Sequence, residues 1–81
     1  MDKTIRIILN DINKIKQFVE DASSFASNID IHKHHYVVDG KSLMGIISID
    51  PSEPIDITIN AIDSEEEMRF EEVFNKYKIE A

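Results

Sequence analysis

The stretch Lys41-Ser42-Leu43-Met44-Gly45-Ile46-Ile47-Ser48 is the part of the sequence on which the fold assignment depends. It places a charged residue and a hydroxyl directly before a short apolar segment that contains one glycine. We expect a short helix there, in which the Ser42 hydroxyl accepts a hydrogen bond from an otherwise unpaired backbone N–H. About two helical turns cannot bury every apolar residue of this stretch, so some of them should be exposed. The stretch therefore predicts a docking surface.

The segments on both sides of this stretch alternate between apolar and polar residues, which is the period of a half-buried β-strand. Before it, residues 29–32 alternate and residues 36–38 form a second β-favouring run, with a hairpin turn expected at residues 33–35. After it, a loop that contains two prolines precedes residues 55–59, where three isoleucines face one way. Residues 4–9 alternate in the same manner. The chain thus contains four predicted strands.

Two longer helices complete the predicted order. The first covers residues 11–26, because its apolar residues recur every three or four positions after a capping Asn10 or Asp11. The last begins at Asp63 or Ser64, where Ser64 and Glu67 match a capping box. One-sided strands and one-sided helices predict an α+β fold. We expect a four-stranded antiparallel sheet with three helices on one face, a two-layer β-sandwich whose other face is open to water.

Composition limits the classes of function. At 81 residues and a net charge of −7, the chain has room for one domain, over residues 1–81, and should repel nucleic acid. It has no cysteine, which excludes disulfides and thiol nucleophiles. No apolar run is long enough for a membrane span or a signal peptide. We therefore expect a cytoplasmic protein that is not inserted in a membrane.

The order of elements and two sequence segments resemble the HPr family, the histidine-containing phosphocarriers of the bacterial phosphoenolpyruvate-dependent sugar phosphotransferase system. The segments are Val19-Glu20-Asp21-Ala22-Ser23-Ser24-Phe25 and the stretch from Lys41 to Ser48. The resemblance runs without a gap over residues 18–49 and continues more loosely through residues 55–62 and the last helix. It implies an open-faced β-sandwich, a protein that is not an enzyme, and partners from the phosphotransferase or carbon-regulation system.

The resemblance fails where the first helix begins. The family has a histidine, an arginine and a proline there, and the histidine nitrogen carries the phosphoryl group at the helix N-terminus. None of the histidines of this chain can replace it, because all three belong to the predicted hairpin. We therefore expect no phosphohistidine relay, and weaker attraction to acidic partner surfaces where the arginine is missing. The three positions read Asp11, Asn13 and Lys14.

Ser42 matches the regulatory serine of the family, which in many Gram-positive members is phosphorylated by an HPr kinase/phosphorylase. The resemblance implies the same regulation here, with the phosphate at a helix N-terminus beside Lys41. It also implies a partner-binding surface, since exposed methionine-containing apolar surface adapts to partners. The residues expected to form it are Ile12, Lys16, Leu43, Met44 and Ile47.

Two alternatives remain open from the residues themselves. Asp11 is most simply a helix cap, yet its carboxylate could accept a phosphoryl group. His32 and His34 would share one face of a continuous strand, a spacing that could bind Zn²⁺ or Ni²⁺, although a solvated hairpin is the commoner outcome. We expect neither a metal nor a cofactor.

Overall fold

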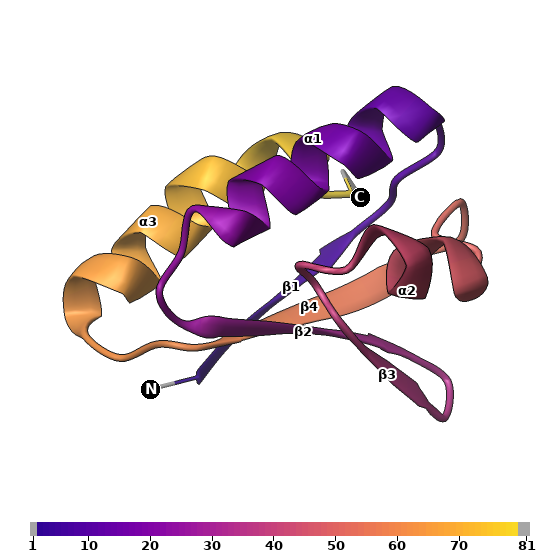
Figure 1. Ribbon diagram of the computed structural model, residues 1–81. Coiled ribbons are helices and arrows are strands. Elements are labelled where there is room, and N and C mark those ends of the chain that lie inside the picture. Colours follow the sequence, from indigo (N-terminus) through magenta and orange to yellow (C-terminus); the bar gives the residue numbers. More distant parts are fainter. Residues whose placement is uncertain (1, 80–81) are drawn as a thin grey trace.

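The computed structural model describes residues 2–79, and within them four strands and three α-helices alternate along the chain (Figure 1). The strands are β1 (Asp2–Ile7), β2 (Asn28–Lys33), β3 (Tyr36–Asp39) and β4 (Ile55–Asn60). The helices are α1 (Ile12–Ser23), α2 (Leu43–Ser48) and α3 (Ser64–Phe74), with a 3-10 turn, η1 (Asn75–Tyr77), directly after α3.

The strands form one antiparallel sheet in the order β1-β4-β2-β3. Ile57 of β4 lies opposite both Ile5 of β1 and Ile31 of β2. Ile31 in turn lies opposite Val38 of β3. Because successive side chains of a strand point to opposite faces, this register gathers the isoleucines of β1, β2 and β4 and Val38 of β3 on one face. Val37 of β3 lies opposite His32 on the other face and is exposed.

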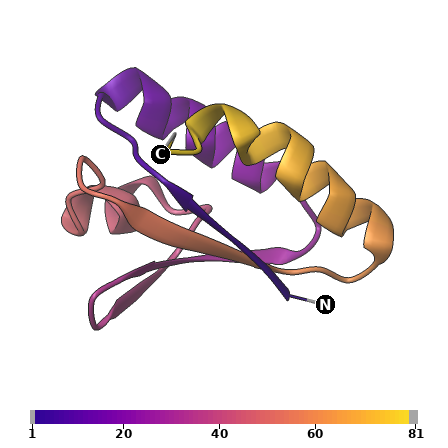
Figure 2. The same ribbon diagram turned by 180° about the vertical axis from the view of Figure 1, so that it is seen from behind.

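The helices cover that apolar face and leave the other face open (Figures 1 and 2). Helices α1 and α3 lie side by side across the sheet, and α2 lies over the end that β3 occupies. Phe74 of α3 packs against two phenylalanine rings. Its ring centroid lies 5.0 Å from that of Phe18 in α1 and 5.6 Å from that of Phe25, which follows α1. The α+β prediction of a four-stranded antiparallel sheet with three helices is confirmed.

The helix boundaries differ from the predicted ones for local reasons. Helix α1 ends at Ser23 rather than at residue 26, because the Ser24 amide bonds back to the Asp21 carbonyl and Phe25 turns into the core. The predicted capping box of α3 is wrong. Asp63 is the cap, and its carboxylate accepts a hydrogen bond from the Glu66 amide at 2.8 Å.

The hairpin between β2 and β3 turns at His34 and His35, within the predicted range. Strand β2 ends at Lys33, and His34 has a φ of 54°, in the left-handed region. His32 and His34 therefore do not share a strand face, since only His32 belongs to the strand, and the exposed hairpin turn that we expect as the commoner outcome is what forms. This weakens the geometric case for the two-histidine metal site.

Candidate functional site

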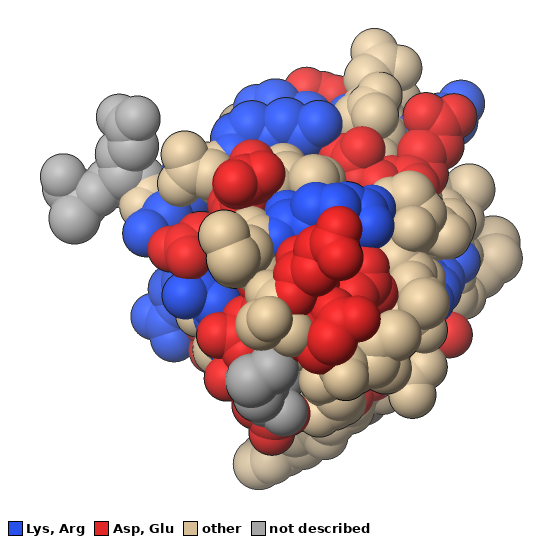
Figure 3. Space-filling view, turned by 90° about the vertical axis from the view of Figure 1, so that its left-hand side faces the viewer, with Lys and Arg blue, Asp and Glu red and all other residues tan. Residues whose placement is uncertain are grey.

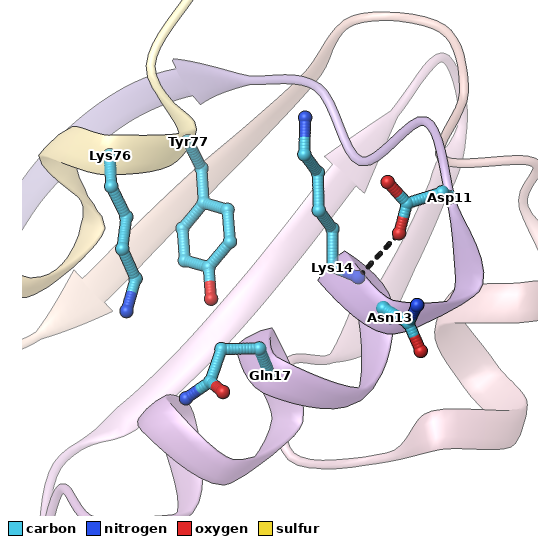
Figure 4. A pocket seen from close by; sticks show the side chains of 6 residues that line it. All are labelled: Asp11, Asn13, Lys14, Gln17, Lys76 and Tyr77. Atoms are coloured by element: carbon cyan, nitrogen blue, oxygen red, sulfur yellow. Dashed lines mark hydrogen bonds between the residues drawn. The ribbon is translucent and has the colours of Figure 1, made fainter.

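Asp11 lies at the N-cap of α1, the position at which the resemblance placed the missing histidine. Its backbone is extended, with φ −150° and ψ 161°, and its Oδ1 accepts a hydrogen bond from the Lys14 amide at 2.8 Å (Figure 4). This bond satisfies one of the backbone donors that every helix leaves unpaired in its first turn. Asn13 and Lys14 occupy that turn. The Asp11 carboxylate therefore acts as the N-cap of α1.

A depression of about 500 Å³ opens beside this helix start (Figure 4). Its walls come from the first two turns of α1 and from η1, so the end of the described chain lies next to the beginning of α1. Lys14 directs its ammonium group to the Asn10 side chain, with Nζ 3.1 Å from Oδ1. The lining residues are Asp11, Asn13, Lys14, Gln17, Lys76 and Tyr77.

Asp21 joins η1 to α1 at the edge of this depression. Its carboxylate accepts hydrogen bonds from the Tyr77 hydroxyl at 2.8 Å and the Gln17 amide at 3.2 Å, and pairs with Lys76 at 2.9 Å. Burial alone would raise the pKa of Asp21, but these bonds outweigh it and lower the pKa. Burial and the bond to Asp21 raise the pKa of Tyr77 above its ordinary value.

Ser42 is the N-cap of α2, as predicted. Its backbone is extended, and its Oγ accepts a hydrogen bond from the Gly45 amide at 3.2 Å. The Lys41 ammonium is directed elsewhere, to the Phe25 carbonyl oxygen at 2.8 Å. Lys41 therefore fixes the start of α2 to the connection between α1 and β2.

Close packing explains why this apolar helix contains a glycine, Gly45. A Cβ built on it would lie 3.4 Å from the Val38 Cβ and 3.3 Å from the Ser42 Oγ. The absence of a side chain therefore lets α2 lie directly on β3 while its cap stays formed.

The predicted docking residues form what we call the α2 patch: Ile12, Lys16, Leu43, Met44 and Ile47. Met44 and Ile47 are 76% and 45% exposed, and Ile12 on α1 is 49% exposed. Leu43 instead packs partly against the core, so it contributes less apolar surface than the sequence suggested. The α2 helix turns Ile46 inward, where it is fully buried. Helices α1 and α2 are in contact, so these exposed side chains lie on neighbouring elements.

Asp11 and the α2 patch lie near each other in the fold. The Leu9 amide, just before α1, donates to the Pro51 carbonyl oxygen, just after α2, at 2.9 Å. The histidines belong to the β2–β3 hairpin, with His32 in β2 and His34 and His35 in its turn. Within residues 2–79, no three His, Cys, Asp or Glu side chains are grouped in a way that could hold a metal ion.

The net charge of −7 does not gather in one place on the surface shown in Figure 3, where acidic and basic side chains lie interleaved. Ion pairs such as Lys3–Glu71, 2.9 Å apart, connect the sheet to α3. None of the helices in the described part of the chain combines the length and the apolarity needed to cross a bilayer.

Comparison with known proteins identifies the family. A family model described as "PTS HPr component phosphorylation site" matches residues 12–75. The chain belongs to the HPr family. The sequence resemblance is thus confirmed, and with it the relation to the phosphotransferase system. The matched range begins at Ile12, the first residue of α1.

Solved structures of HPr proteins share the fold. HPr from Thermoanaerobacter tengcongensis is 28% identical with a TM-score of 0.71, over 95% of this chain and 90% of that one. The phosphocarrier protein HPr of Bacillus anthracis str. Ames is 26% identical with a TM-score of 0.73, over 96% of each chain. The histidine-containing phosphocarrier protein of a Mycoplasma, 18% identical over the full length of both chains, has a TM-score of 0.70 and supports the fold alone. No curated protein matches at a significant level.

Proposed function

We propose that this HPr-family protein does not carry phosphate on a histidine and acts instead by binding proteins of the phosphotransferase or carbon-regulation system. We place this action in the cytoplasm. The observation that supports it most is Asp11 at the N-cap of α1, where its carboxylate accepts the Lys14 amide. A carboxylate has no imidazole nitrogen, so the phosphohistidine chemistry of the family has no acceptor at this place.

Phosphorylation of Ser42 is the proposed control of this binding. The Ser42 Oγ already accepts the Gly45 amide, so a phosphate there would keep an acceptor at the start of α2 and add up to two negative charges. Those charges would lie next to the apolar side chains of the α2 patch. They would weaken the binding of a partner with an apolar contact region and strengthen the binding of a partner that presents arginine.

The α2 patch is the proposed contact surface. Met44 and Ile47 offer apolar area without a covering element in the described chain, and a methionine side chain adapts to differently shaped partners. Lys16 on α1 adds a positive charge at the border of the patch. We therefore expect a partner with an apolar contact region and acidic residues at its rim.

Phosphoryl labelling tests the proposal directly. The protein is incubated with labelled phosphoenolpyruvate and the first enzyme of the system, and separately with labelled ATP and an HPr kinase/phosphorylase. We expect label only from ATP and only on Ser42. Label on Asp11 or on any histidine from phosphoenolpyruvate would overturn the non-carrier role.

The matched variant for this experiment is Ser42→Asn. Asparagine caps a helix about as well as serine, so the fold should be kept while the phosphate acceptor is removed. The Asp11 alternative has its own signature, since an acyl phosphate is base-labile and sensitive to hydroxylamine and would be absent from Asp11→Asn. The metal alternative predicts a rise in melting temperature with Zn²⁺ that the His32→Ala and His34→Ala double variant loses.

Replacement of Met44 tests the surface. Met44→Asp places a charge in the α2 patch and should lower kcat/KM for phosphorylation of Ser42 by the kinase at least tenfold, since the kinase must dock there. Met68→Asp is the matched control, because Met68 is 65% exposed on α3, away from the patch. Equal effects of both variants would show that the patch is not the contact surface.

A further inference from the structure

Lys33, the last residue of β2, has a side chain that is only 9% exposed. Its ammonium nitrogen lies 2.8 Å from the Ile49 carbonyl oxygen and 2.8 Å from that of Asp50. It also lies 2.9 Å from Oε1 of Glu53. An ammonium group has three donors, and here each of them has an oxygen acceptor. The side chain is therefore fully occupied in one fixed position.

The oxygens that surround Lys33 all belong to the end of α2 and the loop that follows it. Ile49 is the C-cap of α2, and the last carbonyl groups of a helix have no partner within the helix. A positive charge is favoured beside them. Asp50 has a φ of 53°, in the left-handed region that aspartate adopts more readily than most residues other than glycine.

From this geometry we infer that Lys33 is the positioning residue of the α2 patch. Two backbone carbonyls and a carboxylate form a small cation-binding loop over residues 49–53, and the Lys33 ammonium is its built-in cation. It fixes the C-terminal end of α2 to the sheet, while Lys41 fixes the other end through the Phe25 carbonyl. The inference rests on the proposed function only in that α2 carries the docking residues.

The consequence is that the exposed side chains of α2 are held ready for a partner before it binds. A six-residue helix has little stability of its own, since nucleation is unfavourable. Without the ammonium group, the Ile49 carbonyl would lose this donor, and the Asp50 carbonyl would keep only the Glu53 amide at 3.5 Å. The end of α2 would then open locally while the sheet and the long helices stay folded.

Residue-resolved hydrogen exchange of the isolated chain tests this, using Lys33→Met, which keeps an apolar stem and removes the charge. We expect the amides of Ile46, Ile49 and Asp50, which form the hydrogen bonds of α2 and its end, to exchange at least tenfold faster than in the wild type. This acceleration should exceed any change at Ile57 in the central strand. A uniform acceleration, or none at α2, would overturn the inference, because a merely stabilising lysine changes all slow amides alike.

We call the contacts of the Lys33 ammonium with residues 49–53 the Lys33 clamp. Two controls distinguish the effect of this clamp from a general effect of lost charge or lost packing. Lys76→Met removes a lysine from a surface ion pair with Asp21 and should leave α2 protected. Lys33→Ala should regain protection in propylammonium chloride but not in sodium chloride of equal concentration. Failure of that rescue would overturn the role of the ammonium group.

A second variant keeps the inference testable if Lys33→Met does not fold. Glu53→Gln changes an exposed carboxylate and leaves both carbonyl contacts in place, so the chain should fold, and the deprotection should be smaller but confined to the same amides. Unchanged α2 exchange in that variant would count against the clamp. None of these measurements uses a partner or a kinase, so their outcome is independent of the labelling that tests the proposed function.

Discussion

Among single residues, the backbone conformation shows where a substitution should raise or lower the free energy of unfolding. His34 is the first of the two residues that turn the β2–β3 hairpin, and its φ is 54°. A two-residue hairpin favours glycine where φ is positive, because glycine has no Cβ to clash with the backbone. The sequence does not reveal this, since histidine is an ordinary residue in a polar turn.

We predict that His34→Gly raises the free energy of unfolding by about 0.5 kcal/mol, because it relieves this conformation at the expense of some chain entropy. Urea unfolding of both proteins measures the difference. The control is His35→Gly, whose φ is not positive and which should lower stability. A loss of stability in both variants would contradict the prediction.

Gly40 is required for a different reason, close packing of two backbones. A Cβ at Gly40 would lie 2.9 Å from both the carbonyl oxygen and Cγ2 of Ile29, and the Gly40 amide already bonds that oxygen at 2.7 Å. We predict that Gly40→Ala lowers the free energy of unfolding by about 2 kcal/mol, in the range of overpacked cores.

Gly45→Ala is the comparison for Gly40→Ala, since its closest contacts would be 3.3 Å and 3.4 Å and alanine favours a helix. Its effect on the unfolding free energy should stay within about 1 kcal/mol. Similar losses in the two variants, measured by thermal unfolding, would show that the close approach of Gly40 to Ile29 is not the cause.

At the scale of elements, a buried carboxylate connects the start of α3 to the start of β2. Oε1 of Glu66 accepts hydrogen bonds from the amide of Ser27 at 2.9 Å and from its hydroxyl at 3.0 Å. Oε2 of Glu66 pairs with Arg69 at 3.1 Å, and the Arg69 guanidinium also covers the Phe25 ring at 4.1 Å. The cap of α3 at Asp63 positions Glu66 for this contact, because it holds the Glu66 amide.

We predict that Glu66→Gln lowers the free energy of unfolding by about 1–3 kcal/mol, since the new amide group must face either Ser27 or Arg69, which are donors. Glu65→Gln, an exposed neighbour in the same first turn, should change it by less than about 1 kcal/mol through the helix dipole alone. Chemical unfolding of both variants measures this. Equal losses would mean that the Ser27 contact contributes nothing.

At the scale of the whole molecule, acid pH should destabilise the protein. Bonds from the Ser27 amide lower the pKa of Glu66 against the effect of burial. Burial would raise the pKa of Asp21 as well, but its hydrogen bonds outweigh this effect and lower the pKa. The unfolded chain therefore binds more protons than the folded chain as the pH falls. The stability that these two carboxylates contribute is fully present above their ordinary pKa values, 3.8 for Asp21 and 4.5 for Glu66. It is lost as the pH falls through their lower pKa values in the folded state.

We predict that the urea midpoint declines from pH 6 to pH 3 and that Asp21→Asn makes the decline shallower. The neutral side chain loses its pairing with Lys76 and no longer takes up a proton. Midpoints measured at several pH values check this. A midpoint that rises on acidification, or an unchanged slope in Asp21→Asn, would contradict it.

The order of the elements, the buried faces of β1, β2 and β4, the caps at Asp11 and Ser42, and the family were predictable from the sequence. These follow from periodicity and from contacts within a few residues, which a linear pattern records. The exposed side chains of α2 were predictable for the same reason, because a short helix cannot bury them all. The capping of α3 was not, since Asp63 and Ser64 are both good caps and neighbours in space select between them.

The contacts that hold these elements in place depend instead on how the layers pack. Tyr77 meets Asp21 across 56 positions of the chain, Glu66 meets Ser27 across 39, and Lys33 reaches Ile49 across 16. No local pattern specifies such pairs, because a charged residue in a strand or helix is usually solvated and its partner is set by how the layers pack. The sequence thus indicated where a partner could dock, and the packing revealed how the Lys33 ammonium keeps that surface in position.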